Sequence, residues 1–134
     1  MLSNMQNMLP AFLAYFAVSM VLLAVFLFIY IKVTPYNEII LIREGNVAAS
    51  ISLAGTLMGF AMPVANVIAH SDALLDLTAW SIVACLIQIF AYLAARITVP
   101  QLVNDIPQGK IAPAIFLASL SATVGLINAA CMTY

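Results

Sequence analysis

Four apolar segments in this sequence are each long enough to cross a membrane, and they constrain the fold more than any other feature. About 20 mostly apolar residues cross the roughly 30 Å of hydrocarbon, and the segments are residues 10–31, 47–69, 75–95 and 111–132. None alternates with a period of two, which favours helices over barrel strands. The chain is 66% hydrophobic and 7% charged. We therefore predict an all-α membrane protein with four transmembrane helices in the lipid bilayer, the first beginning at Pro10.

The positive charges divide completely between two of the connections. Lys32 and Arg43 lie between the first and second segments, and Arg96 and Lys110 lie between the third and fourth. Because cytosolic loops carry an excess of Lys and Arg, both termini and residues 70–76 are predicted to lie on the opposite side from the cytosol. Four aromatic residues near the span ends fit interfacial belts, Trp80 on the outer side and Tyr30, Tyr36 and Tyr92 on the inner side.

The two halves of the chain resemble each other at an offset of 64 residues. The charge is kept at Lys32 and Arg96, and identical residues include Phe26/Phe90, Thr34/Thr98, Gly45/Gly109 and Ala48/Ala112. These matches at one constant offset indicate an internal repeat, with residues 1–72 as a first helical hairpin and residues 73–134 as a second. Both hairpins would enter from the same side, so the repeats are predicted to be parallel.

Small and polar residues form a stripe in the second and fourth spans. Spacings of three and four place them on one helix face, and they are Ser52, Gly55, Thr56, Gly59, Pro63 and Asn66 in the second span and Ala114, Ala118, Ser121, Gly125 and Asn128 in the fourth. We expect these two spans to form the interior and the bulkier first span, with Leu23, to face lipid. The stripe either packs helices closely or lines a polar path, and both interpretations stay open.

The first inner loop, residues 32–46, is predicted to contain a short helix lying at the membrane surface. Thr34 can cap it, Pro35 suits its first position, and Asn37 and Glu38 fall in or near its first turn. Glu38 is expected either to be solvated or to fold back toward the start of the second span. In the second case its partner would be the backbone amides of residues 46–49 or one of the two cations of this loop.

The sequence lacks the usual patterns of catalytic and metal sites. It has no Ser–His–Asp arrangement, paired carboxylates, HExxH motif or phosphate-binding loop, so we predict neither enzyme activity nor a cofactor. The outer side gathers soft metal donors without ligand spacing, which predicts no metal site; they are Met5, Met8, Met62, His70, Cys131 and Met132. Cys85 and Cys131 form no disulfide framework, and the net charge of -1 argues against nucleic-acid binding.

The motifs "TPYNE", "GNVAAS", "LAGTLMG" and "NAACMTY" carry a family resemblance over nearly the whole chain. The matching residues are Thr34, Pro35, Asn37, Glu38, Gly55, Thr56, Gly59, Pro63, Asn128 and Cys131. In this pattern the chain resembles the uncharacterised bacterial inner-membrane proteins of the UPF0719 group. Their repeated unit is a two-helix hairpin called domain of unknown function 350. The second half, with "TVPQLVND", lacks the Asn–Glu pair, so a role for this pair belongs to the first half alone.

The resemblance implies a bacterial inner membrane and four spans, and it supplies no catalytic residue. In such a membrane, the distribution of positive charge predicts that both termini are periplasmic. Members are similar to proteins encoded near envelope-stress and membrane-scaffold genes, which implies a partner role. The first functional hypothesis is a homo-oligomeric assembly or scaffold protein that presents its cytosolic loops to cytosolic or membrane protein partners, with a possible link to envelope stress. The alternative is a small channel or carrier whose polar path lies between the second and fourth spans.

Overall fold

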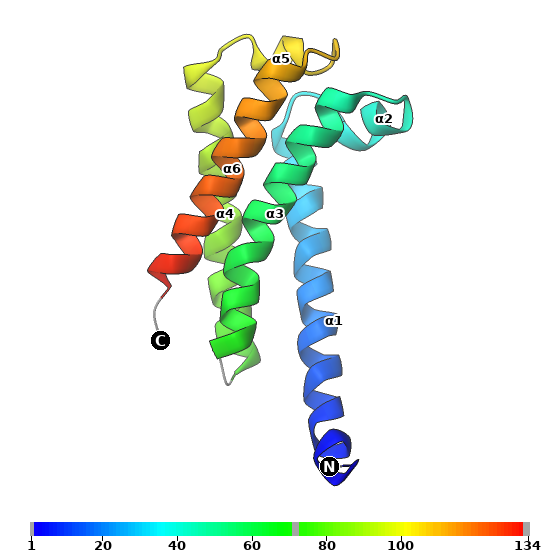
Figure 1. The fold of residues 1–134 in the computed structure, drawn as a ribbon, viewed down its shortest axis with the longest axis vertical. Coiled ribbons are helices and arrows are strands. Elements are labelled where there is room, and N and C mark those ends of the chain that lie inside the picture. Colours follow the sequence, from blue (N-terminus) through cyan, green and yellow to red (C-terminus); the bar gives the residue numbers. More distant parts are fainter. Residues whose placement is uncertain (1, 71–72, 133–134) are drawn as a thin grey trace.

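The computed structural model describes residues 2–70 and 73–132, and in these ranges it contains helices and no strands. The helices are α1 (Leu2–Val33), α2 (Glu38–Arg43), α3 (Val47–His70), α4 (Leu74–Thr98), α5 (Leu102–Asp105) and α6 (Ile111–Cys131). The four long helices lie side by side and are apolar enough to cross a membrane (Figure 1). The predicted all-α architecture with four spans is thus confirmed.

The short helices α2 and α5 lie at one end of the bundle, which we call the loop end (Figure 1). The opposite end, where α3 ends and α4 begins, is called the terminal end. Gly45 and Gly109 stand just before α3 and α6 with φ of 86° and 84°, a left-handed conformation that glycine adopts without strain. Elements begin 64 residues apart, α5 after α2 and α6 after α3. That the halves are parallel repeats and that the termini are periplasmic stay predictions.

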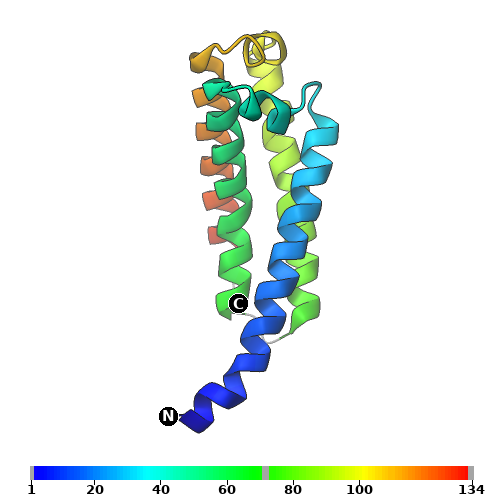
Figure 2. The same ribbon diagram turned by 90° about the vertical axis from the view of Figure 1, so that its right-hand side faces the viewer.

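The start of α1 was predicted wrongly. The helix begins by Leu2, and Pro10 lies inside it. Figure 2 shows this N-terminal part bending away from the bundle. Proline removes one helical hydrogen bond and crowds the preceding turn, so helices bend there. The polar residues Asn4, Gln6 and Asn7 are exposed and do not stop the helix.

The four spans differ strongly in how much of each is buried. Within an apolar stretch of 18 residues in each span, 6% of the residues are buried in α1 and 56% in α3, which confirms that the first span faces lipid most. The second and fourth spans were expected to form the interior, and this was only half right, because 33% of the corresponding stretch is buried in α4 and 22% in α6. The physical reason is position, since α4 packs against α1, α3 and α6, whereas α6 packs mainly against α3 and α4.

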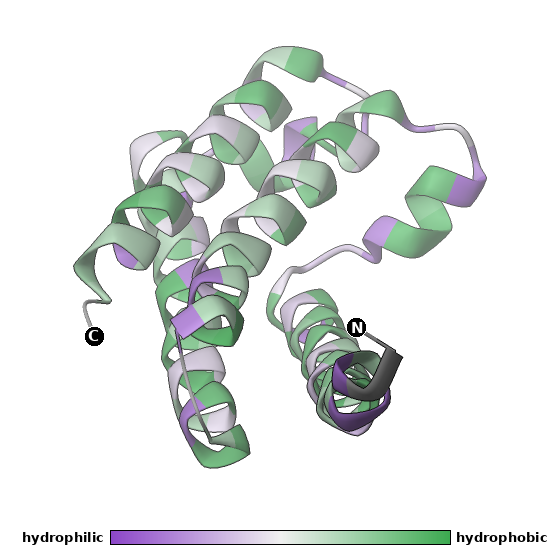
Figure 3. Cartoon of the chain, turned by 60° about the horizontal axis from the view of Figure 1, so that its bottom comes forward, coloured by the Kyte–Doolittle hydropathy of each residue, from purple (hydrophilic) through white to green (hydrophobic). Residues whose placement is uncertain are grey.

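Aromatic side chains fill the core toward the loop end. Phe26 of α1 stacks on Phe60 of α3 with ring centroids 4.3 Å apart, and Tyr30 meets Tyr92 of α4 edge-on at 5.8 Å. Both tyrosines are fully buried, so their predicted place in an interfacial belt is wrong: both rings turn into the bundle. Leu23 was also misplaced, because it packs partly buried against this core. Figure 3 shows hydrophobic residues over most of the long helices and hydrophilic residues gathered in the connections.

Candidate functional site

The glycines of the small-residue stripe bring the backbones of α3 and α6 into direct contact. A Cβ atom on Gly55 would overlap Ala118, and one on Gly59 would overlap the carbonyl of Ser121. A Cβ on Gly125 would overlap the backbone of Gly59 itself. The stripe is therefore used within one chain, and at these points α3 and α6 leave no space for an aqueous path between them.

Toward the terminal end, Asn66 of the small-residue stripe holds the end of α6. Asn66 of α3 donates hydrogen bonds from Nδ2 to the carbonyls of Ala129 and Met132, at 2.9 and 3.1 Å. Carbonyls in the last turn of a helix lack helical donors, so Asn66 acts as a cap supplied by another helix. Pro63 is buried inside α3, and Asn128 is half-buried with no partner for Nδ2.

A buried chain of hydroxyl groups crosses the middle of the bundle. Thr56 of α3 lies 3.3 Å from the Tyr30 hydroxyl and 3.4 Å from the Ser121 hydroxyl, and its own hydroxyl donates to the carbonyl of Ser52. Gln88 of α4 donates from Nε2 to the carbonyl of Ser121 at 3.1 Å. All four long helices thus contribute to one polar contact region inside the apolar bundle.

The buried face of α4 carries three polar atoms that have no hydrogen-bond partner of good geometry. They belong to Ser81 (Oγ), Gln88 (Oε1) and Tyr92 (hydroxyl), with Arg96 as the cation close to the tyrosine. Their spacings of seven and four place them on one helix face. The sequence analysis missed Ser81 and placed Tyr92 at the surface, although the same spacing of three and four, extended through Ala84 and Ala95, could have indicated this face.

At the loop end, the capping and packing roles of the inner loop differ from the prediction. Asn37, not Thr34, caps α2 by accepting a hydrogen bond from the Ile40 amide at 3.2 Å, and Pro35 lies exposed before the helix. Glu38 is 1% exposed. Its Oε1 lies 2.7 Å from the Thr34 hydroxyl, and its Oε2 has no partner.

The expected partners of Glu38 were therefore wrong. No ion pair joins it to a cation in the part of the chain that the structure describes. The amide of Ala49 at the start of α3 is taken by the side chain of Asn46 at 3.0 Å. Thr34, four residues earlier in the chain, is the residue that contacts the Glu38 carboxyl instead. Burial raises the pKa of Glu38, and the hydrogen bonds from Thr34 and from its own backbone N–H only partly oppose this.

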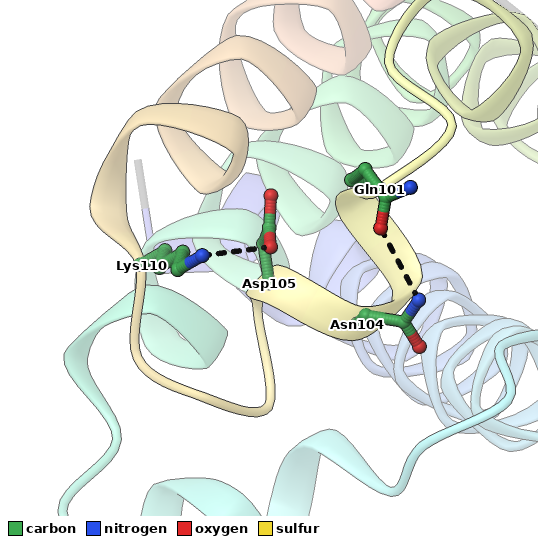
Figure 4. A network of polar contacts seen from close by, with 4 residues as sticks. All are labelled: Gln101, Asn104, Asp105 and Lys110. Carbon is green, nitrogen blue, oxygen red and sulfur yellow. Dashed lines mark hydrogen bonds and ion pairs between the residues drawn. The ribbon is translucent and has the colours of Figure 1, made fainter.

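The two connections of the loop end are fastened to each other by Asn46. While its Oδ1 caps α3, its Nδ2 donates to the carbonyls of Ile106 and Pro107 at 3.0 and 3.1 Å. Figure 4 shows the second connection closed by an ion pair of 3.3 Å between Asp105 and Lys110 and by a weak Gln101–Asn104 contact. Between the connections lies an open hollow of about 420 Å³, lined by both turn glycines.

The described ranges offer no group of three or more His, Cys, Asp or Glu side chains that could hold a metal ion. Cys85 is half-buried and Cys131 is exposed, and both are free thiols. The chemistry of the site therefore rests on hydroxyl, amide and carboxyl groups, which can bind protons, water or polar ligands.

Comparisons with known proteins find a matching family model and similar membrane proteins. The family model described as "Domain of Unknown Function (DUF350)" matches residues 4–132. The UPF0719 inner membrane protein YjfL of Escherichia coli K12 is 36% identical over 126 residues, which cover 94% of this chain and 96% of that protein. The UPF0719 transmembrane protein YshE of Bacillus subtilis is 25% identical over 100 residues, 75% of each chain. No solved structure matches the chain.

Proposed function

Because the chain belongs to the DUF350 family of UPF0719 inner-membrane proteins, we propose that it is a membrane assembly protein whose loop end presents a fixed surface to protein partners. Its place is the bacterial inner membrane, as a multi-pass helical protein. The family has no assigned activity, so the argument rests on the structure of the loop end.

The observation that carries this proposal is that the two connections are fastened in one arrangement. Asn46 bridges them, and Glu38 inserts the start of α2 into the bundle. A surface that is already ordered loses little conformational entropy on binding, which leaves more of the contact energy for affinity. Connections used only to join spans do not require such bridges. The surface also exposes the apolar residue Ile40, at 52%, in a hollow that Lys32 and Arg43 help to line.

The proposal places the loop end in the cytosol, in agreement with the distribution of positive charge. Single cysteines at Ser3 and Gln108, in a background without Cys85 and Cys131, test this with an impermeant thiol reagent on whole cells. We expect labelling at Ser3 and none at Gln108 until the membrane is opened. The reverse pattern would invert the orientation and remove the cytosolic partner surface.

An affinity experiment tests the partner surface directly. Tagged protein is captured from native membranes in mild detergent, and co-purifying proteins are quantified for wild type, Ile40→Asn and Leu75→Asn. Leu75 is the matched control because it is an exposed apolar residue at the terminal end. A partner is expected to be enriched with wild type and Leu75→Asn and lost with Ile40→Asn. Equal recovery with both variants contradicts the assignment of the surface.

A homo-oligomer belongs to the same proposal. Since the small residues of α3 and α6 are used within one chain, association between copies has to use another surface, and α1 offers the largest lipid-facing one. Mass measurement of the protein in native nanodiscs tests this, and a monomer there rejects it. A link to envelope stress would appear as a phenotype of a deletion strain under such stress.

A small channel or carrier is the second candidate function. It is favoured by the three unpartnered polar atoms on the buried face of α4, because an unsatisfied polar group in hydrocarbon costs several kcal/mol and water can satisfy it. Gln88 is the residue to test, because Asn66 is committed to the end of α6. Flux of ions or small solutes into liposomes that is lost in Gln88→Leu but kept in Asn66→Ala would favour this function over a scaffold alone.

A further inference from the structure

We propose that Glu38 forms a binding site for a single proton, and that α2 docks into the bundle with this carboxyl in its neutral form. The site is built by the Glu38 carboxyl, the Thr34 hydroxyl and the tyrosine rings of α1 and α4. It stands independently of whether the loop end binds a protein partner.

The first argument is the count of hydrogens around Thr34. Its Oγ1 lies within hydrogen-bond distance of the Ile31 carbonyl at 3.2 Å, the Tyr36 carbonyl at 3.0 Å and Glu38 Oε1 at 2.7 Å. A threonine hydroxyl has one hydrogen to donate. The carbonyl of Ile31 also has no helical donor four residues later, because Pro35 has no N–H. A protonated Glu38 would donate to Thr34 and free the threonine hydrogen for one of the carbonyls.

The second argument is that no cation among the described residues forms an ion pair with Glu38. The titratable groups that interact with Glu38 are the phenols of Tyr30, Tyr36 and Tyr92, and burial raises the pKa of Tyr36 further, so that it is neutral too. On α3, against which α2 packs, no titratable side chain precedes His70.

The cations near α2 are directed elsewhere. Lys32 lies 5.3 Å from the centre of the Phe28 ring, and Arg43 is exposed. Arg96 is exposed as well and interacts with the Tyr92 hydroxyl, not with the Glu38 carboxyl. The remaining acid of this connection, Glu44, is exposed as well. An ionised carboxylate removed from water without a cation is strongly disfavoured, so such groups take up a proton instead.

The third argument comes from the second half of the chain. The residue 64 positions after Glu38 is Leu102, which also begins a short helix and is also fully buried. An apolar side chain therefore fills the corresponding position at the start of α5. A neutral carboxyl is the ionisation state of glutamate that comes closest to this environment.

Docking of α2 must then depend on pH, with a defined sign. Burial raises the pKa of the docked carboxyl above that of the free one, so the docked state binds more protons. Docking is strongest below the pKa of the free carboxyl and weakens by about tenfold per pH unit as the pH rises. The weakening ends once the pH exceeds the pKa of the docked carboxyl.

Infrared spectroscopy of the full chain in nanodiscs tests the proton site. The C=O stretch of a protonated carboxyl is recorded against pH for wild type, Glu38→Gln and Glu44→Gln. We expect a band that persists at pH values above the range in which carboxyl groups usually ionise. This band is absent in Glu38→Gln and unchanged in Glu44→Gln. If the Glu38-dependent band disappears at the pH values at which carboxyl groups usually ionise, Glu38 does not retain its proton above them and the proposal fails.

Hydrogen exchange of the α2 amides tests the coupling. The exchange rate of wild type is divided by that of Glu38→Gln at each pH, which removes the intrinsic pH dependence. This ratio is expected to be near one at low pH and to rise by up to about tenfold per pH unit. Glu38→Leu introduces the residue found at position 102 and should behave as Glu38→Gln does. It serves as the reference if Glu38→Gln does not fold. A ratio that stays at one at every pH overturns the coupling.

Discussion

The contact between Gly59 of α3 and Gly125 of α6 makes a quantitative prediction possible. In Gly59→Ala, the new methyl would overlap the carbonyl of Ser121 and lie 2.7 Å from Gln88 Nε2, where ordinary contacts are 3.4–4 Å. The helix backbone cannot yield as a flexible side chain does, so α3 and α6 must move apart. Overpacking costs about 1–3 kcal/mol, and loss of the Gln88–Ser121 hydrogen bond adds about 0.6–2 kcal/mol. We expect a loss of about 2–5 kcal/mol in the free energy of unfolding.

Gly125→Ala should act at the same contact, because its methyl would overlap the Gly59 backbone. Once either methyl has separated the helices, the other meets less resistance. The double variant is therefore expected to lose less than the sum of the single variants, with a coupling of about 0.5–3 kcal/mol. Unfolding is followed by far-UV circular dichroism in mixed micelles with increasing denaturing detergent. Ala54→Val, on the exposed face of α3, is the control, and a Gly59→Ala loss no larger than this control would refute the close contact.

Two further substitutions test how the other parts are held. Asn46→Ala removes the cap of α3 and the bridge to the second connection, so we expect a loss of about 1–3 kcal/mol and faster amide exchange in both connections, whereas Asn104→Ala on the exposed side of α5 should change neither. Phe26→Ala leaves a cavity in the core and should lower the free energy of unfolding by about 3–5 kcal/mol, measured by the same detergent unfolding. Phe28 is 63% exposed, so Phe28→Ala should cost far less. Equal losses would show that α1 does not dock through Phe26.

The spans were predictable from the sequence because the length of an apolar segment and the charges beside it report directly on the membrane. Three of the four helices begin within one residue of the predicted position. The close contact of α3 and α6 was also predictable, since glycines at spacing four are costly in a helix unless another backbone approaches. The buried face of α4 was missed because bulky lipid-facing residues such as Phe90 dominate the average of that span.

The role of Glu38 could not be read from its own sequence neighbourhood. A carboxylate in the first turn of a short helix fits a solvated residue equally well, and its direction depends on tyrosines that come from α1 and α4, far apart in the sequence. The one signal available was the counterpart in the second half, Leu102. An apolar residue at the matching position indicates that the position is buried, and this would have favoured a buried, neutral acid over an ion pair with Lys32 or Arg43.

The unequal lengths of the helices have a consequence for how the protein fits into lipid. With 32 residues, α1 is about 48 Å long, whereas α6 with 21 residues is about 32 Å long. Only the shorter length matches the hydrocarbon thickness without tilting. Because α1 packs against the core between Tyr15 and Tyr30, the segment before Tyr15 can change its tilt while α3, α4 and α6 keep their packing. The chain thus combines three helices that pack against one another with a longer span whose N-terminal segment can adjust to bilayers of different thickness.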